Sequence, residues 1–213
     1  MAEQTAGVRI ERLVTSGTFS LDGGTWEVDN NVWIVGDDAE VIVIDPAHDA
    51  AAVAAAVGDR KTHAVLLTHG HDDHIRAARE AADLLNAPLY LNPADRMLWD
   101  AVYDEAPDVE IADGDEYAVA GVRLTAKHTP GHSPGSTCFA APALGAVFTG
   151  DTLFQGGPGA TGRSYSSFDT IIHSIREHLL VLPEETVVYT GHGDTTTIGA
   201  EKPHLQEWID RGH

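Results

Sequence analysis

The sequence predicts an α+β fold in which two β-sheets pack against each other and helices cover the outer faces. Three observations predict it. Residues 1–45 are rich in β-branched and aromatic runs, helix–strand units follow, and a second strand-rich stretch precedes the C-terminal helices. Because a sheet must bury its apolar face, two strand-rich halves with interspersed helices favour sheet packed on sheet with helices outside.

In the N-terminal half, the expected strands are residues 8–14, 19–38, 40–46 and 62–68, and the expected helices are 49–57 and about 75–87. A turn is expected between the first two strands, and Gly23-Gly24 supplies a further turn signal. The run EVIVIDP at 40–46 is β-branched and ends in Asp-Pro, which is typical of a central strand.

The second half continues the same alternation. The expected strands are residues 88–92, 115–129 with a turn at Gly121, 136–142, 146–151 and 186–190, and the expected helices are 95–103, 167–182 and 200–211. We find no linker, low-complexity segment or internal repeat, so we expect a single domain spanning residues 1–213.

Composition narrows the class of function. Acidic residues outnumber basic ones 33 to 13, a formal charge of −20 that repels nucleic acid and anionic lipid. We therefore expect a small-molecule substrate, no nucleic acid and no membrane partner; the oligomeric state stays open. The first residues do not resemble a signal peptide, so we expect a cytoplasmic protein. The single cysteine, Cys138, lies in an expected strand and is interpreted as a buried, inert thiol.

The densest polar cluster is T-H-G-H-D-D-H, residues 68–74, which follows the apolar strand and precedes a helix. Its side chains thus lie on a loop at the carboxyl end of a strand, where binding sites often occur. Imidazole suits zinc and iron, and carboxylate adds an oxygen ligand. One ion in a catalytic site takes about three or four ligands. Four ligands in this loop alone therefore indicate two adjacent metal sites.

Further ligands are expected from other strand ends. Three candidates each follow a glycine: His132 in T-P-G-H-S, Asp151 in F-T-G-D-T and His192 in Y-T-G-H-G-D. The remaining histidines are interpreted as solvated or structural. The full set of candidate metal ligands is His69, His71, Asp73, His74, His132, Asp151 and His192. Asp45 is a candidate to accept a hydrogen bond from one of the ligand histidines.

These residues resemble the H-x-H-x-D-H loop and the later His, Asp and His of the metallo-β-lactamase superfamily. The resemblance runs from EVIVIDP to the C-terminal TGHGDTTTIGAEK. It implies a four-layer αβ/βα sandwich with metals at one edge between the sheets. It also implies a division of ligands. The first metal would take His69, His71 and His132; the second would take Asp73, His74 and His192; and Asp151 would bridge them.

Within the superfamily the chain is similar to the glyoxalase II group, through FTGDTLFQGGPGATGRSYSSF and the LPEETVVYTGHGD tail. Arg163 and Tyr165 in this loop are candidate substrate-binding residues, and arginine offers a fork for a carboxylate or phosphate. Glyoxalase II proper adds a C-terminal helical region that binds glutathione, whereas this chain ends about twenty residues beyond His192. We therefore expect a thioester of another small thiol, such as a mycothiol-type thiol.

The resemblance implies hydrolysis of this thioester by a metal-bridging hydroxide between ions about 3.5–4 Å apart. Asp73 is the candidate catalytic residue, orienting the water and accepting its proton. We expect two divalent metal ions, Zn²⁺ in first place, with iron or manganese as alternatives.

Three alternatives stay open: a lactonase or other ester hydrolase of the same fold, a mononuclear iron oxidoreductase similar to persulfide dioxygenases, and a non-catalytic metal-binding protein. True β-lactamases usually carry cysteine where this chain has Asp151, which disfavours antibiotic hydrolysis.

Overall fold

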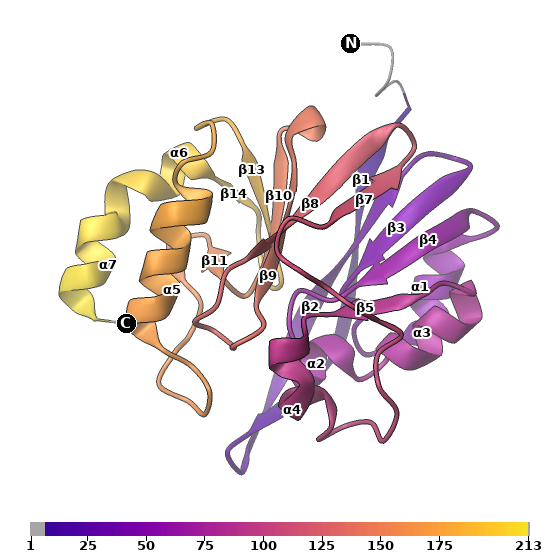
Figure 1. Ribbon diagram of the computed structural model, residues 1–213, viewed down its shortest axis with the longest axis horizontal. Helices are drawn as coiled ribbons and strands as arrows, with labels where there is room; N and C mark the ends of the chain where they lie inside the picture. The colour runs from indigo at the N-terminus through magenta and orange to yellow at the C-terminus, as the bar shows by residue number, and fades with distance from the viewer. Residues whose placement is uncertain (1–6, 213) are drawn as a thin grey trace.

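The computed structural model describes residues 7–212, which form two six-stranded sheets packed face to face with helices outside (Figure 1). The first sheet, in the order β1-β2-β3-β4-β5-β6, consists of Arg9–Leu21, Gly24–Gly36, Glu40–Ile44, Lys61–Leu66, Leu89–Leu91 and Val109–Glu110. The second sheet, in the order β14-β13-β10-β9-β8-β7, consists of Thr196–Thr197, Val187–Thr190, Ala146–Gly150, Thr137–Ala141, Val122–His128 and Glu116–Val119. A short ribbon pairs β11 (Leu153–Phe154) with β12 (Gly157–Pro158).

The helices α1 to α7 are Ala50–Val57, Asp72–Ile75, Ala78–Leu85, Arg96–Trp99, Phe168–Ser174, Ile198–Glu201 and Leu205–Arg211. Short 3₁₀ turns occupy Pro93–Asp95, Pro142–Leu144 and Lys202–His204, and a wider helical turn at Ile175–Leu179 continues α5. No helix among residues 7–212 has the length and apolar composition required to span a membrane.

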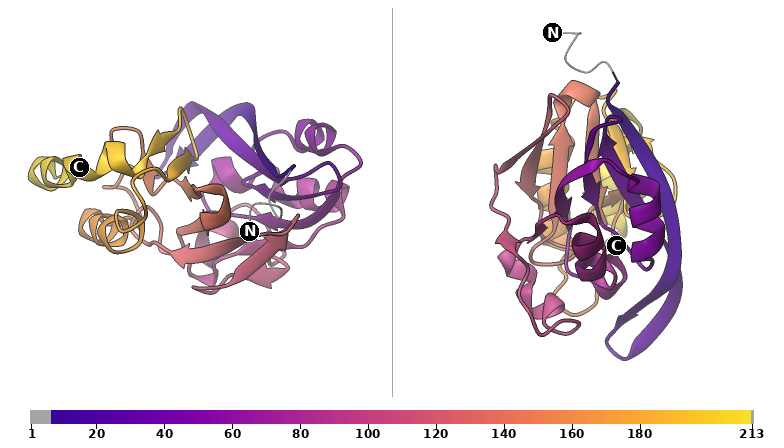
Figure 2. Two further views of the ribbon diagram at one scale, coloured as in Figure 1. Left: turned by 90° about the horizontal axis from the view of Figure 1, so that it is seen from above. Right: turned by 90° about the vertical axis from the view of Figure 1, so that its right-hand side faces the viewer.

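The four layers form because successive side chains of a strand point to opposite faces of its sheet. On β3, Val41 and Val43 pack against α1 and α3, whereas Ile42 and Ile44 face the second sheet. This follows from the period of two along a strand, which sends successive side chains to opposite faces. A third apolar cluster joins the second sheet to α5 and α7. Figure 2, seen from above, shows the resulting order of helix, sheet, sheet and helix, which confirms the expected αβ/βα sandwich.

The first two strands form a long hairpin of two equal strands instead of the short strand at residues 8–14 and the long strand at residues 19–38 that were expected. Residue-for-residue pairing runs from Arg9 opposite Gly36 to Leu21 opposite Gly24, so the turn expected between residues 14 and 19 was wrong. Gly17 lies inside the strand, where a Cβ atom would come within 2.1 Å of the His48 ring. This glycine therefore makes room for a side chain and does not mark a turn. The hairpin tip extends beyond the sheet at the bottom of Figure 1.

The helix expected at residues 75–87 begins earlier and is interrupted. Helix α2 starts at Asp72, directly after His71, and α3 starts at Ala78. The single O–H of Tyr103 lies within hydrogen-bonding distance of the carbonyl oxygens of Ile75 and Arg76, at 2.8 and 2.7 Å, where a continuous helix would use those oxygens itself. As a result, Asp73 and His74 lie in a single short turn at the edge of the first sheet.

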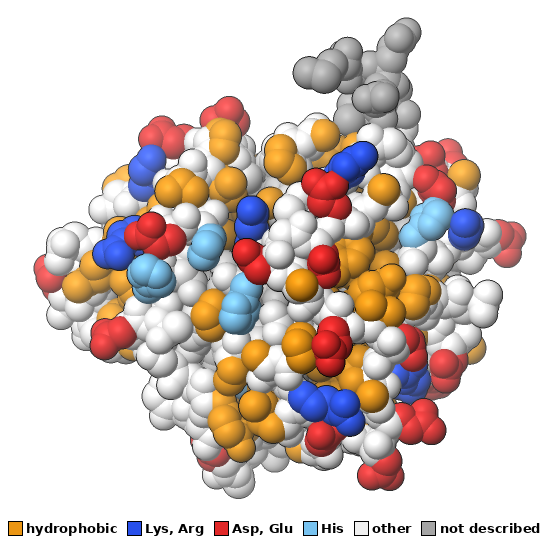
Figure 3. Space-filling model, viewed as in Figure 1, with side chains coloured by type: hydrophobic (Ala, Val, Ile, Leu, Met, Phe, Trp, Pro, Cys, Tyr) orange, Lys and Arg blue, Asp and Glu red, His pale blue; other side chains and the backbone are white. Residues whose placement is uncertain are grey.

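Acidic side chains are spread over all parts of the face shown in Figure 3, as the composition predicts. The buried residues below this surface include the candidate ligands.

Candidate metal centre

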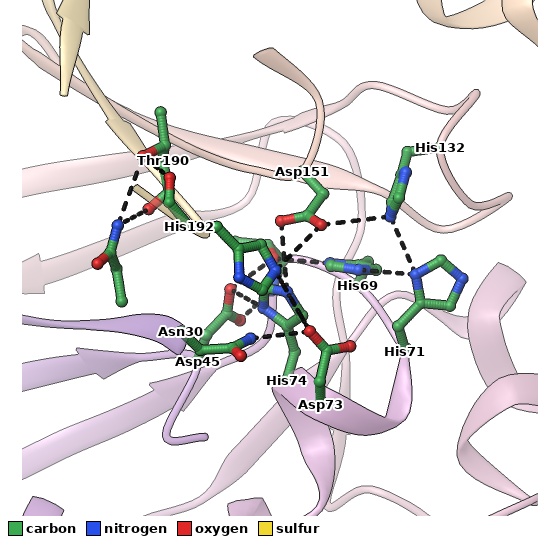
Figure 4. Close-up of polar contacts among 12 residues, drawn as sticks. Asn30, Asp45, His69, His71, Asp73, His74, His132, Asp151, Thr190 and His192 are labelled. Atoms are coloured by element: carbon green, nitrogen blue, oxygen red, sulfur yellow. Dashed lines mark hydrogen bonds and ion pairs between the residues drawn. The ribbon is translucent and has the colours of Figure 1, made fainter. Parts of the chain in front are cut away.

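The structure brings all seven candidate ligands together at one edge of the two sheets (Figure 4). His69, His71, Asp73 and His74 follow β4 of the first sheet. The other three come from the second sheet, His132 between β8 and β9, Asp151 after β10 and His192 after β13. The carboxyl ends of these strands meet where the sheets face each other, so residues more than a hundred positions apart share one site.

Two groups of three ligands lie side by side. In the first, the Nδ1 atom of His71 lies 3.1 Å from His69 Nε2 and 3.0 Å from His132 Nε2. In the second, Asp73 Oδ2 lies 3.2 Å from His192 Nε2 and 3.5 Å from His74 Nε2. These two groups coincide with the division of ligands that the resemblance implies. We call them the first ligand group and the second ligand group.

Asp151 lies between the groups. One carboxylate oxygen is 3.3 Å from His74 Nε2, and the other is 3.6 Å from His132 Nε2 and 3.4 Å from His192 Nε2. A third set of ligand atoms, from His69, His74 and Asp151, also lies within 4.8 Å of one another. The carboxylate is thus in reach of both groups, as a bridging ligand would be.

Two glycines permit this crowding. Gly150, before Asp151, has a φ of +48°, and a Cβ there would lie 2.2 Å from the Thr68 hydroxyl. A Cβ on Gly191, before His192, would lie 2.2 Å from the Asp151 carboxylate. Larger residues at either position would push the ligand loops apart, which gives a steric reason for the glycines that precede the candidate ligands.

Hydrogen bonds on the outer side of the rings determine which nitrogen faces the centre. His74 Nδ1 donates to Asp45 at 2.9 Å, His132 Nδ1 to the Ala160 carbonyl at 2.9 Å, and His192 Nδ1 to the Asp29 carbonyl at 2.7 Å. The Nε2 lone pair of each neutral ring then points inward, as in metal sites where an outer acceptor fixes the tautomer. The contact with Asp45 confirms its expected role.

The donor set fits divalent metal ions. Ring nitrogens of five histidines converge at 3.0–3.3 Å in these two groups. Among residues 7–212, Asp151 Oδ1 is buried and makes no hydrogen bond of normal geometry, with His74 Nε2 3.3 Å away. A buried carboxylate oxygen that is not fully hydrogen-bonded is costly, and a cation at this position would compensate it. Mixed imidazole and carboxylate ligands are those that zinc and iron prefer.

The two groups differ in electrostatics. Burial, strengthened by neighbouring histidines, holds the pKa of His69 well below its ordinary value and lowers that of His71 to about 3. Burial alone would also lower the pKa values of His74 and His192. The surrounding carboxylates outweigh it, raising the pKa of His74 well above its ordinary value and that of His192 to about 10.

The carboxylates respond in the opposite sense. Burial alone would raise the pKa values of Asp73 and Asp151, but His74 and His192 lower them, to about 2 for Asp73 and well below the ordinary value for Asp151. Without metal, the second ligand group is therefore an ion-paired cluster of imidazolium and carboxylate, whereas His69 and His71 in the first group are neutral.

A cavity of about 310 Å³ opens above the ligands. Its walls come from the β1–β2 hairpin, from β11 and from the loop after β12. Outside the ligand set, the lining residues are Phe19, Trp26, Val28, Phe154, Ala160, Arg163, Ser164 and Ser166. The ring of Phe19 lies 5.2 Å from that of His71, and the ring of Phe154 lies 6.2 Å from that of His192. A substrate bound over the ligands would therefore touch aromatic side chains.

The hairpin and the loop are joined across the cavity. The Arg163 guanidinium lies over the rings of Trp26 at 3.9 Å and Phe19 at 5.4 Å. The backbone N–H and the hydroxyl of Ser164 both donate to the Asp22 carboxylate at the hairpin tip, at 3.0 and 2.6 Å. Arg163 is thus held flat in the cavity wall.

The structure does not bring Tyr165 to the cavity. Its backbone has a φ of +69°, its side chain is 57% exposed, and its neighbours Ser164 and Ser166 line the cavity in its place. Sequence reasoning also missed a contributor. Asn30 donates to Asp73 at 2.9 Å and contacts His48 at 2.7 Å through its amide oxygen. An asparagine within a strand has no spacing signal that would mark it.

The comparisons with known proteins agree with this geometry. The sequence profile of the metallo-beta-lactamase superfamily matches residues 25–192. The chain belongs to this superfamily, whose members are mainly metal-dependent hydrolases and whose fold binds divalent metals. Hydroxyacylglutathione hydrolase GloC of Haemophilus influenzae is 32% identical over 182 residues, covering 78% of this chain and 86% of that protein.

Two crystal structures are similar in fold. That of BLEG-1, a B3 metallo-beta-lactamase, has a TM-score of 0.77 and 28% identity and covers 90% of this chain and 98% of its own. That of TTHA1623 in a di-iron-bound form has a TM-score of 0.73 and 30% identity and covers 82% of this chain and 93% of its own. The activities for which these relatives are named differ, so the shared fold does not fix the substrate.

Proposed function

We propose that this protein is a hydrolase that uses two divalent metal ions to cleave a thioester of a small thiol. The observation that carries the proposal is the pair of three-ligand groups with one carboxylate, Asp151, in reach of both. The likeness to a hydroxyacylglutathione hydrolase supports the thioester class. Zinc is proposed first because most of the ligands are imidazoles. Iron is the main alternative, since a similar protein was crystallised with two irons, and manganese is the second.

Bound in such a pair, the ions lower the pKa of water toward neutrality and polarise a carbonyl oxygen. The residues of the chain supply orientation. The second Asp73 oxygen is free of the contacts made by Oδ2 and can accept a hydrogen bond from the attacking water. The pKa of Asp73, about 2, makes it a weak base, so its part is to orient the water more than to store its proton.

The cavity would hold the two sides of the thioester. Phe19, Trp26 and Phe154 offer apolar surface for carbon chains. The Arg163 guanidinium, which lies over the ring of Trp26, adds a cation that can bind a substrate carboxylate. A thiolate is a good leaving group, so the chain needs no strong acid beside it. This matches a cavity whose remaining polar residues are serines.

The test begins with metal content and substrate class. Purified protein is assayed by elemental analysis and with a panel containing a hydroxyacyl-glutathione thioester, thioesters of other small thiols, an acyl lactone, a cephalosporin and glutathione persulfide. We expect about two metal ions per chain and the highest kcat/KM with a thioester. Preference for the lactone or the cephalosporin would reject the thioester class and keep the hydrolase. Oxygen uptake with persulfide and one iron per chain would reject both.

A further inference from the structure

Asp95 is a buried carboxylate outside the ligand set, at the end of the 3₁₀ turn between β5 and α4. It has no solvent exposure. One oxygen accepts from the Gly135 N–H at 2.5 Å; the other accepts from the Gly70 N–H at 2.8 Å and from the Ser133 hydroxyl at 2.6 Å. Burying a carboxylate is costly in free energy unless hydrogen bonds compensate it, and here three donors do so. The location of these donors shows which parts of the chain the carboxylate holds together.

The three donors belong to the two loops that carry the first ligand group. Gly70 stands between His69 and His71, and Ser133 directly follows His132. The first of these loops leaves the first sheet and the second connects strands of the second sheet. A single carboxylate therefore links the backbones of two ligand loops that have no covalent connection nearby.

The surroundings are shaped for this carboxylate. A Cβ on Gly135 would lie 2.7 Å from Asp95 Cγ, and one on Gly70 would lie 3.0 Å from Asp95 Cβ. The Ser136 hydroxyl contacts the Ser133 hydroxyl at 2.8 Å and accepts from the Ser133 N–H at 3.0 Å, which completes the network on the second loop. Glycine at position 135 thus allows an approach that a Cβ atom would block, and at position 70 it avoids a tight contact.

We propose that Asp95 is a positioning residue that holds His69, His71 and His132 in their ligand geometry before metal binds and so sets the affinity of the first ligand group. Metal binding to preorganised ligands loses little conformational freedom, whereas two independent loops would have to be ordered by the ion itself. The inference rests on the metal-binding part of the proposed function and is independent of the substrate.

The test compares Zn²⁺ affinity in a His192→Ala background, which lacks a ligand of the second group, by calorimetric titration of metal-free protein. Asp95→Asn preserves shape but removes the charge and presents an amide N–H₂ to backbone donors. We expect roughly a 10–100-fold loss of affinity, the range typical of such outer contacts. Affinity within twofold of the background protein would overturn the inference. Failure of the background protein to bind Zn²⁺ would count against the proposed function instead.

Glu201→Gln in the same background is the matched control. Glu201 is also buried and accepts from Thr196 at 2.6 Å and Gly156 at 3.0 Å, but neither partner adjoins the first group. We expect it to lower the melting temperature and leave Zn²⁺ affinity unchanged. An equal loss of affinity in both variants would show a general effect of weakened folding and overturn a role specific to Asp95.

Ser133→Ala decides the matter if Asp95→Asn does not fold. This variant removes one of the three donors and keeps the carboxylate. We expect a several-fold loss of Zn²⁺ affinity with circular dichroism unchanged, and an unchanged affinity would overturn the inference.

Discussion

The two neighbouring ligand groups differ in how their side chains are held and in the charge of those side chains. The first consists of three histidines whose loops are joined by a buried carboxylate that touches backbone and hydroxyl groups. The second contains a carboxylate of its own, and Asp45 and Asp151 contact its histidine His74. Consequently His69 and His71 of the first group present neutral lone pairs, whereas the second group forms an ion-paired cluster when no metal is bound.

Ligands of one metal site can therefore be ordered before a cation binds in two ways. Neutral donors need only be held in place, because no proton has to leave before the ion enters. Ion-paired donors keep their shape through mutual attraction but must exchange protons for the metal. The following predictions test this contrast, beginning with the residue common to both groups.

Replacing the shared carboxylate should have the largest effect. Asp151→Ala removes the oxygens that lie within 3.3–3.6 Å of histidines from both groups. We expect turnover of the best thioester to fall by at least about 10²–10³-fold and bound metal to decrease. Elemental analysis and steady-state kinetics measure both.

The control for this variant is Asp194→Ala, which removes an 82% exposed carboxylate that pairs with Arg12 at 3.6 Å. A surface ion pair of this kind contributes little to the stability of the folded protein, so activity should stay near that of the wild type. Full metal content and activity in Asp151→Ala would remove the basis for a shared site.

The pH dependence of metal binding should separate the groups. The raised pKa values of His74 and His192 keep both rings protonated at neutral pH without metal, so binding to the second group must release these protons. Its affinity should therefore rise with pH between 6 and 8. His69 and His71, with lowered pKa values, are already neutral, so these two ligands should release no protons when metal binds and the first group should depend less on pH than the second.

Titration calorimetry in buffers of different ionisation enthalpy measures the protons released. His192→Ala isolates the first group and His132→Ala isolates the second. Equal proton release from the two variants would contradict the electrostatic contrast.

Asn30 offers a more limited perturbation of the second group. Its amide donates to Asp73, so Asn30→Ala leaves that carboxylate oxygen with one contact fewer. We expect roughly a tenfold loss of metal affinity in the second group and none in the first. The same two isolating variants provide the measurement, and a loss confined to the first group would refute the assignment.

The hydrogen bonds between Ser164 and Asp22 at the hairpin tip should affect substrate binding but not metal binding. Asp22→Ala removes both hydrogen bonds from Ser164 at the cavity roof, and we expect a several-fold rise in KM with kcat and metal content nearly unchanged. A large fall in metal content would mean that the hairpin supports the ligands as well.

The smallest effect is expected at Cys138, which lies outside both groups. Its side chain is buried, and burial raises its pKa to about 11 in spite of contacts with Thr129 and Thr152. Cys138→Ala should therefore leave turnover within about twofold of wild type. The folded protein should also resist thiol reagents at pH 8; rapid labelling would contradict this.

Much of this architecture follows from patterns within a few residues. The β-branched run in EVIVI predicts a central strand, and Val41 to Ile44 indeed divide between two apolar clusters. The turn expected between residues 14 and 19 shows the limit of such reasoning, because Gly17 lies within a continuous strand there and leaves space for the distant ring of His48.

The layered fold, the buried thiol and the seven side chains that meet at the strand ends could be predicted from the sequence, because each strand and each ligand motif is a pattern of a few neighbouring residues. Only the tertiary structure decided which histidine nitrogen faces inward, that Arg163 and not Tyr165 lines the cavity, and that Asp95 and Asn30 support the ligands. The physical reason is distance along the chain: Asp95 meets Gly70 and Gly135 across 25 and 40 residues. No local pattern encodes a contact made only when two sheets close on each other.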